Sequence, residues 1–133
     1  MLDPKESNPA YVCGRLLATL EAVQYQGVGD VGANVIDRFY GRVSTAPRLV
    51  FGQLLGFAQN HLGAIDNNGI RISLDREMQE IIDLLGSTFP PTLSLEDQGR
   101  FAIGYWHQKS HRFATIRRNR DERAATSANA PSN

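Results

Sequence analysis

The chain has 133 residues, is 41% hydrophobic, and carries 14 basic and 14 acidic side chains. This length suits one domain with its own hydrophobic core, and the composition is that of a soluble globular protein. No apolar run is long enough to cross a membrane, so we expect no membrane partner. The single cysteine, Cys13, excludes an internal disulfide and fits the reducing cytoplasm, where we expect the protein to act.

The zero net charge hides an uneven distribution along the chain. Residues 1–99 hold 7 basic and 12 acidic side chains, whereas residues 100–133 hold 7 basic and 2 acidic ones. Twelve of the 14 basic residues are arginines. Arginine donates two parallel hydrogen bonds to phosphate, although it is also common in ordinary ion pairs. An anionic partner is therefore expected at the basic end of the chain.

The sequence predicts helices, and the first of them runs from Pro9 to about residue 26. Asn8 is placed as its N-cap, and Pro9 suits the first turn because its fixed φ angle matches that of a helix. Gly14 and Ala18 are four residues apart and share a face of this helix. Small residues at this spacing favour close approach of a neighbouring helix.

A glycine-rich stretch at 27–32 is predicted to form a turn. It lacks the Lys-Ser/Thr ending of a P-loop and follows a helix instead of a strand, which argues against a phosphate-binding loop. A second helix is predicted over about 31–42, and a third over about 47–62 with Pro47 in its first turn. The spacing of apolar residues indicates one buried face on each helix.

The fourth helix is predicted from Ser73 to about Leu85, after a turn at 66–69 and a short extended piece at 70–72. Its acidic residues indicate either a solvated face or a docking surface for a basic subunit. These residues are Asp75, Glu77, Glu80 and Asp83.

The fifth helix is predicted to begin at Leu95 and to end near Ile116 or slightly beyond it. Ser94 is placed as its N-cap, and Asp97 three residues later completes the pattern of a capping box. The sequence after Ala124 is rich in Ala, Ser, Asn and Pro and is predicted to be disordered. The predicted core stripe of this helix is Leu95, Ala102, Ile103, Trp106 and Phe113.

These elements predict an all-α fold, a compact bundle of about five helices. Residues 1–123 are expected to form a single domain, and residues 124–133 a disordered tail. The sequence contains no nucleophile elbow, zinc motif, Walker motif or carboxylate cluster suited to two-metal nuclease chemistry. We therefore expect a protein that is not an enzyme and that has no cofactor.

Three arginines cluster around the end of the second predicted helix. Arg38 and Arg42 are four residues apart and share a face, and Arg48 follows beyond the next turn. Two interpretations remain open, namely contact with phosphates, or a solvated face that Asp37 partly neutralises. Exposed ion pairs stabilise a protein little, so they do not explain why the cations cluster.

The third predicted helix carries two glycines on its polar side. Glycine inside a helix costs about 1 kcal/mol relative to alanine, so Gly52 and Gly56 require a reason. One reason is close approach of another backbone, either protein or nucleic acid; the other is tight packing within the same domain. Gly52, Gly56 and the nearby Gln59 are the candidate residues for packing against a partner.

The fifth helix combines basic residues with two histidines. Arg100, His107 and His111 are predicted to share the face opposite its core stripe. The histidines have the i, i+4 spacing of a metal-binding pair, but no cysteine or carboxylate lies nearby on that face, so we expect no metal site.

Five arginines within 112–123 exceed what is needed to offset a helix dipole, which favours an anionic partner. The candidate nucleic-acid-binding residues are Arg38, Arg42, Arg48, Arg100, Lys109, Arg112, Arg117 and Arg118.

Three separated motifs carry a resemblance to a known family. They are Asn8-Pro-Ala-Tyr-x-x-Gly-Arg15, Arg38-Phe-Tyr-Gly-x-x-Ser-x-x-Pro-x-x-Val-Phe51, and the stretch 90–108. Together they resemble the C-terminal region of the large subunit of the type I-C CRISPR Cascade complex. That region is also made as a separate protein in this family, the Cascade small subunit. Because Met1 precedes the first motif by only a few residues, the free-standing small subunit is the favoured interpretation.

The resemblance implies a non-catalytic subunit that supports target DNA binding and stabilises the R-loop through sequence-independent phosphate contacts. The partners it implies are the large subunit, the repeated backbone subunits, a second copy of the chain, target DNA with its displaced strand, and guide RNA. Two alternatives remain open. In the first, the chain is a purely structural spacer between proteins, and its arginines are merely solvated. In the second, the chain is the excised C-terminal helical domain of the large subunit.

Overall fold

The computed structural model describes residues 1–29, 34–86 and 88–128. The described residues contain five helices and no strand, so the predicted all-α bundle is confirmed. In chain order the helices are α1 (Pro9–Val28), α2 (Val35–Thr45), α3 (Pro47–Gly63), α4 (Asn68–Leu85) and α5 (Leu95–Ala128). None of them is long and apolar enough to cross a membrane.

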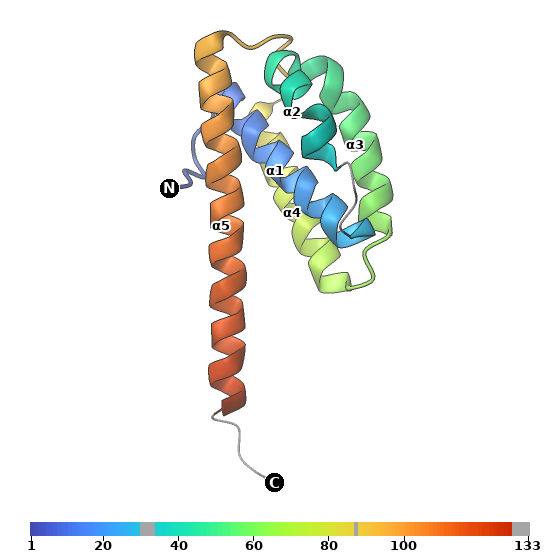
Figure 1. Cartoon of the computed structure of the whole chain (residues 1–133), viewed down its shortest axis with the longest axis vertical. Coiled ribbons are helices and arrows are strands. Elements are labelled where there is room, and N and C mark those ends of the chain that lie inside the picture. Colours follow the sequence, from blue (N-terminus) through green and yellow to red (C-terminus); the bar gives the residue numbers. More distant parts are fainter. Residues whose placement is uncertain (30–33, 87, 129–133) are drawn as a thin grey trace.

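Helix α1 lies at the centre of the bundle and contacts each of the other four helices (Figure 1). Twelve of its 20 residues are buried, including the whole stretch from Ala10 to Leu20. A helix that is buried on all sides must be apolar on all sides, and α1 is apolar around most of its circumference. Its contact with α5 is the most extensive of all helix pairs.

The backbones of α1 and α5 touch where they cross. A Cβ atom on Gly14 of α1 would collide with the carbonyl oxygen of Phe101 and lie 2.7 Å from the backbone nitrogen of Tyr105. A Cβ atom on Gly104 of α5 would in turn collide with the carbonyl oxygen of Tyr11. The close approach predicted at Gly14 is therefore confirmed, and Gly104 is its counterpart on α5.

Ser94 caps the start of α5 as predicted, while the Asp97 side chain accepts from Arg100. The side-chain oxygen of Ser94 accepts a hydrogen bond from the backbone N–H of Asp97 at 3.1 Å. Asn8 likewise caps α1 by accepting from the backbone N–H groups of Ala10 and Tyr11. Each cap satisfies N–H groups that have no partner within the first turn of a helix.

The start of α4 differs from the prediction. Asn67 is the N-cap and accepts from the backbone N–H of Ile70, so the helix begins at Asn68. The extended piece predicted at 70–72 is therefore helical, and Ser73 lies inside the helix. The prediction failed because it assigned Asn67 to a turn, although asparagine is as good an N-cap as serine.

The ends of α2 and α5 also differ from the prediction. Residues 30–33 lie outside the described residues; from Val35, α2 runs to Thr45 instead of ending near Arg42. Asn34 caps α2 in a capping box with Asp37.

Helix α5 continues to Ala128, well past the predicted end near Ile116, because glycine and proline are absent between Gly104 and Pro131. Residues 124–128, predicted to be disordered, are thus helical; 129–133 lie outside the described residues.

We predict that Gly14→Ala weakens the fold, since a methyl group must push α1 and α5 apart. Overpacking of this kind costs about 1–3 kcal/mol. Gly56→Ala is the matched control: a Cβ atom there would meet no atom within 4 Å, so the control is expected to stabilise the helix by about 0.5–1 kcal/mol. Urea unfolding followed by circular dichroism measures both changes. Equal stability of the two variants would contradict the close crossing.

The only cysteine gives a second prediction for the fold. Cys13 is fully buried on α1, and this burial raises the pKa of its thiol to about 12. The thiolate is the nucleophile, so we expect a water-soluble thiol reagent at neutral pH to label the folded protein slowly and the urea-unfolded protein fast. Fast labelling under native conditions, without unfolding by circular dichroism, would show that α1 is not central.

Candidate nucleic-acid interface

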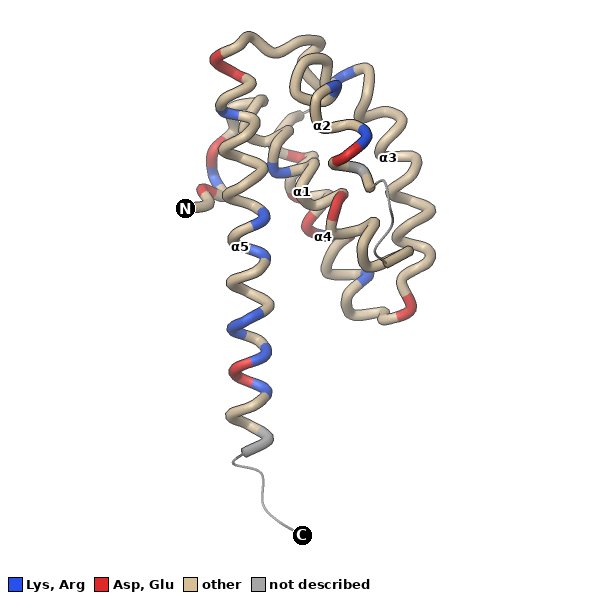
Figure 2. The backbone as a smooth tube through the Cα atoms, in the orientation of Figure 1, with Lys and Arg blue, Asp and Glu red and all other residues tan. Residues whose placement is uncertain are grey.

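Helix α5 has an N-terminal part that packs on α1 and a C-terminal part that projects beyond the bundle (Figure 1). Basic residues gather on the projecting part (Figure 2), which also carries the acidic pair Asp121 and Glu122. Within the described part of the chain, none of the projecting arginines forms an ion pair; Arg123 makes only a long 3.5 Å bond to the Asn119 carbonyl. All four are exposed: Arg117, Arg118, Arg120 and Arg123.

Two predicted nucleic-acid-binding residues instead make contacts inside the bundle. The ammonium group of Lys109 lies 3.2 Å from a carboxylate oxygen of Glu21 on α1. Arg112 donates to a carboxylate oxygen of Glu77 on α4 at 2.8 Å. Each of these side chains is at most about 28% exposed. Partly buried ion pairs of this kind join helices, so both cations already have acidic partners within the fold.

A buried polar network extends from the Arg112 pair into the core. Arg15 of α1 is only 7% exposed, and its Nε donates to the Gln108 side chain at 2.8 Å. Gln108 in turn donates to one carboxylate oxygen of Glu77, and the other carboxylate oxygen accepts a hydrogen bond from Arg112. Burial lowers the pKa of Arg15, while the charge of nearby Glu77 opposes this effect. The network joins α1, α4 and α5, so Glu77 is a partly buried contact between helices and not a member of the solvated acidic face.

Arg100 lies at the start of α5 and is neutralised by its own helix. It donates to Glu96 and to Asp97, each at 2.8 Å, and the hydrogen bond with Asp97 is the main cause of its raised pKa. Exposed ion pairs at this spacing contribute little to the stability of the protein. They nevertheless partly neutralise Arg100 and so weaken its attraction to a phosphate.

Arg100 and His107 share a face of α5 as predicted, since both line one hollow beside the N-terminal segment, but His107 is partly buried there. The Nδ1 atom of His107 lies 2.9 Å from the Tyr11 hydroxyl, and its Nε2 lies 3.2 Å from the Met1 amino group. His107 thus connects the N-terminal segment to α5, whereas His111 is exposed. Among residues 1–29, 34–86 and 88–128, no group of three potential metal ligands occurs.

The arginines of α2 and the start of α3 remain at the surface. The guanidinium groups of Arg38 and Arg42 lie 5.3 Å and 5.6 Å from the centre of the Phe39 ring. Arg48 donates to the backbone carbonyl of Phe89 at 3.0 Å, which attaches α3 to the segment before α5. Asp37 takes part in the capping box of α2. The structure thus brings Arg38 and Arg42 together over one aromatic ring, while Arg48 has a structural role as well.

The two glycines of α3 face open solvent. A Cβ atom on Gly52 or Gly56 would meet no atom of the described residues within 4 Å, and Gln59 is exposed beside them. Packing within the domain, one of the two interpretations of these glycines, is therefore wrong. The adjacent Leu49 is 81% exposed, so the outer side of α3 combines small residues with one large apolar side chain. Packing against a partner there stays a prediction.

The core stripe predicted for α5 is largely on the outside. Trp106 and Phe113 are 57% and 54% exposed, and Leu95 and Ile103 are exposed as well. The residues that pack on α1 are instead Phe101, Gly104, Tyr105 and Gln108. Helix α5 carries two apolar stripes, and the glycine contact with Tyr11 selects the other one. The sequence signal for this choice was Gly104, whose missing side chain permits the close contact with Tyr11.

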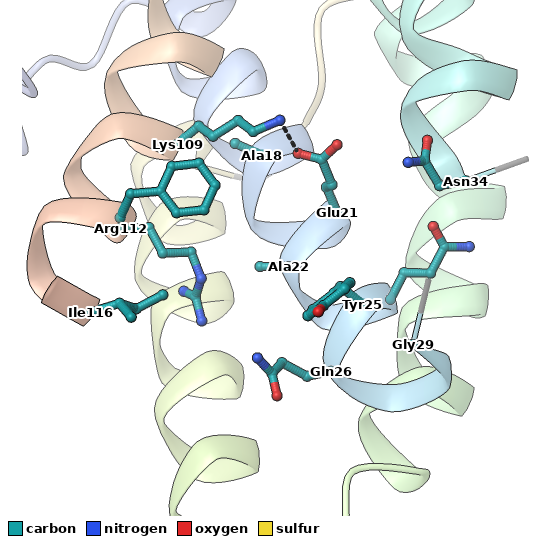
Figure 3. Close-up of a pocket in the computed structure, with 12 residues that line it drawn as sticks. Ala18, Glu21, Ala22, Tyr25, Gln26, Gly29, Asn34, Lys109, Arg112 and Ile116 are labelled. Atoms are coloured by element: carbon teal, nitrogen blue, oxygen red, sulfur yellow. Dashed lines mark ion pairs between the residues drawn. The ribbon is translucent and has the colours of Figure 1, made fainter. Parts of the chain in front are cut away.

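A cleft of about 430 Å³ opens between α1 and α5, next to the projecting arginines. Tyr25 of α1 and Ile116 of α5 lie on opposite walls (Figure 3). Phe113 also lines it, as do Lys109 and Arg112. The cleft is therefore aromatic and aliphatic within, and basic along its α5 wall.

The fold and surface define a small all-α protein with a projecting, arginine-bearing helix. A family model described as CRISPR-associated protein (Cas_Csd1) matches residues 1–113, which is most of the chain. The chain therefore belongs to this family of CRISPR-associated proteins, which confirms the resemblance carried by the three motifs. No curated protein matches the chain. The matched region ends at Phe113, so Arg117 and the arginines after it lie beyond it.

We predict that Glu77→Ala destabilises the bundle by about 1–3 kcal/mol, because Arg112 and the buried Gln108 lose their common acceptor. Glu80→Ala is the control, since Glu80 is exposed on the same helix; it should change stability by less than about 0.5 kcal/mol. Thermal unfolding compares the two. A Glu77 variant as stable as the control would show that the network does not join the helices.

Proposed function

We propose that the chain is a non-catalytic small subunit of a type I-C CRISPR Cascade complex and helps the complex hold target DNA during R-loop formation. The proposal rests on the family membership, on the three motifs, and on the surface of α5. The C-terminal region of the large subunit would use the same surface, because it would have the same fold.

The observation that carries the DNA-binding role is the set of projecting arginines. Lys109, Arg112 and Arg100 all have acidic partners within the chain. Arg117, Arg118, Arg120 and Arg123 form no ion pair within the described part of the chain. With Asp121 and Glu122 among them, they leave a net positive charge over two turns of helix, which an anionic partner would offset.

The mechanism we propose is independent of sequence. Arginines neutralise phosphates and release condensed counterions, while base pairing between guide RNA and target strand selects the sequence. A displaced single strand is flexible, so a projecting basic helix lowers its freedom to re-pair with the target strand. Arg38 and Arg42 on α2 form a second, smaller basic surface for the same nucleic acid.

Protein partners are expected at a different face. The outer side of α3, with Gly52, Gly56 and Gln59, carries no charged residue between Leu49 and Asn60. Such a surface suits close packing against another Cas subunit, either a backbone subunit or a second copy of the chain. In this arrangement α3 holds the subunit in the complex and α5 faces the DNA.

To test the DNA-binding role, Arg117, Arg118, Arg120 and Arg123 are replaced together by glutamine in the assembled complex. We expect intact assembly and weaker DNA capture. The salt dependence of log K should become shallower by about 0.7 for each phosphate of a single strand that the variant no longer neutralises. The bundle should keep its thermal stability because these side chains make no ion pair within the described chain.

The control is Arg71→Gln/Arg76→Gln on α4, which removes two cations away from α5. This variant should bind DNA as the unchanged complex does, with the same salt slope. If the α5 variant also keeps its affinity and slope at every salt concentration, the arginines are merely solvated and the structural-spacer alternative is correct.

A further inference from the structure

One face of α5 alternates aromatic and basic side chains along the helix. With 3.6 residues per turn, the five residues that form this face fall within about 80° of the helix circumference. We name it the aromatic–basic face: Trp106, Lys109, Phe113, Arg117 and Arg120. Lys109 is already paired with Glu21, so the cations that this face offers to a partner are the two arginines.

The members of this face nearest the bundle adjoin one another. The ammonium group of Lys109 lies 5.4 Å from the centre of the Trp106 ring. Lys109 and Phe113 line the same cleft, together with Tyr25 of α1 across from them. The face therefore begins at Trp106, passes the mouth of the cleft, and continues along the projecting arginines.

Neither aromatic ring belongs to the core, although Trp106 packs edge-on against the buried Tyr105. Trp106 is 57% exposed and Phe113 is 54% exposed, and the core of the bundle is complete without either. Exposed apolar side chains that gather in one patch mark a binding surface, and Phe113 adjoins the exposed Tyr25 and Ile116 at the cleft. An apolar partner helix would explain the rings but not the arginines that continue the same face.

Single-stranded nucleic acid explains both kinds of residue. Proteins that bind single strands combine cations that follow the phosphates with aromatic rings on which bases stack. Duplex DNA would satisfy the arginines, but its bases are already stacked and cannot cover the rings. Charge complementarity therefore favours a single strand over an apolar protein segment, and the exposed rings favour it over a duplex.

We propose that Trp106 and Phe113 are base-stacking residues, and that the aromatic–basic face of α5 binds single-stranded nucleic acid with its bases as well as its phosphates. This inference rests on the proposed DNA-holding function and adds to it two residues that contact the bases of the strand. The cleft beside Phe113 is large enough to admit part of a base, and Tyr25 supplies a second ring there.

Trp106 provides a direct readout because it is the only tryptophan in the chain. The full chain is titrated with an oligothymidylate of about 15 nucleotides, within the site size of known single-strand binders. An abasic oligonucleotide of the same length, with the same phosphates but no bases, is the matched probe. We expect the oligothymidylate to quench Trp106 fluorescence and to bind more tightly than the abasic strand.

Leucine variants separate stacking from apolar contact, since leucine keeps apolar surface but has no π face. Phe113→Leu and Trp106→Leu are each expected to weaken oligothymidylate binding by about five-fold or more, measured by fluorescence anisotropy of a labelled strand, with little effect on the abasic strand. Ile72→Ala removes an exposed apolar side chain on α4 and should change neither.

The outcomes distinguish the inference from the function on which it rests. Equal affinity for both oligonucleotides, no quenching and unchanged leucine variants would overturn base stacking, yet salt-sensitive binding through the arginines would leave the DNA-holding function standing. If neither oligonucleotide binds at low salt, the DNA-holding function itself fails. Leucine variants that bind DNA normally but no longer enter the complex would overturn base stacking and assign the rings to a protein contact.

Discussion

Two glycines let the backbones of α1 and α5 touch, and this contact orients everything that α5 presents to solvent. Gly104 must face Tyr11, because any side chain there would separate the helices. The helical repeat then turns Phe101, Tyr105 and Gln108 inward and leaves Trp106 and Phe113 outside. A different rotation of α5 would bury those two rings and move the arginines to another side of the molecule.

The same orientation sorts the basic residues into two groups. Lys109 and Arg112 lie at the level of the bundle, where Glu21 and Glu77 reach them from α1 and α4. The arginines after Ile116 lie beyond these helices (Figure 2), and no acidic side chain of the described bundle pairs with them. A helix that extends past its bundle is thus the physical reason why some cations stabilise the fold and others stay available to a partner.

Local chemistry made the starts of α1 and α5 predictable, whereas the start of α4 was missed. Asn8 and Ser94 cap their helices as expected, since caps depend on residues within one turn, and Gly14 signalled a close crossing.

The rotation of α5 could not be predicted, because Trp106 and Phe101 mark two apolar stripes and only the glycine contact decides between them. The pairing of Lys109 and Arg112 was equally hidden, because their acidic partners lie far away in the sequence. The family was recognisable from its motifs, and the family model confirms it.

The central claim is that the projecting part of α5 contacts nucleic acid within a CRISPR complex. A cryo-EM structure of the assembled complex bound to target DNA, with the R-loop open, tests it most directly. We predict density for a nucleic-acid strand along the projecting arginines Arg117 to Arg123, with phosphates against their guanidinium groups. A projecting helix that is buried in a neighbouring protein subunit, with the strand elsewhere, would contradict it.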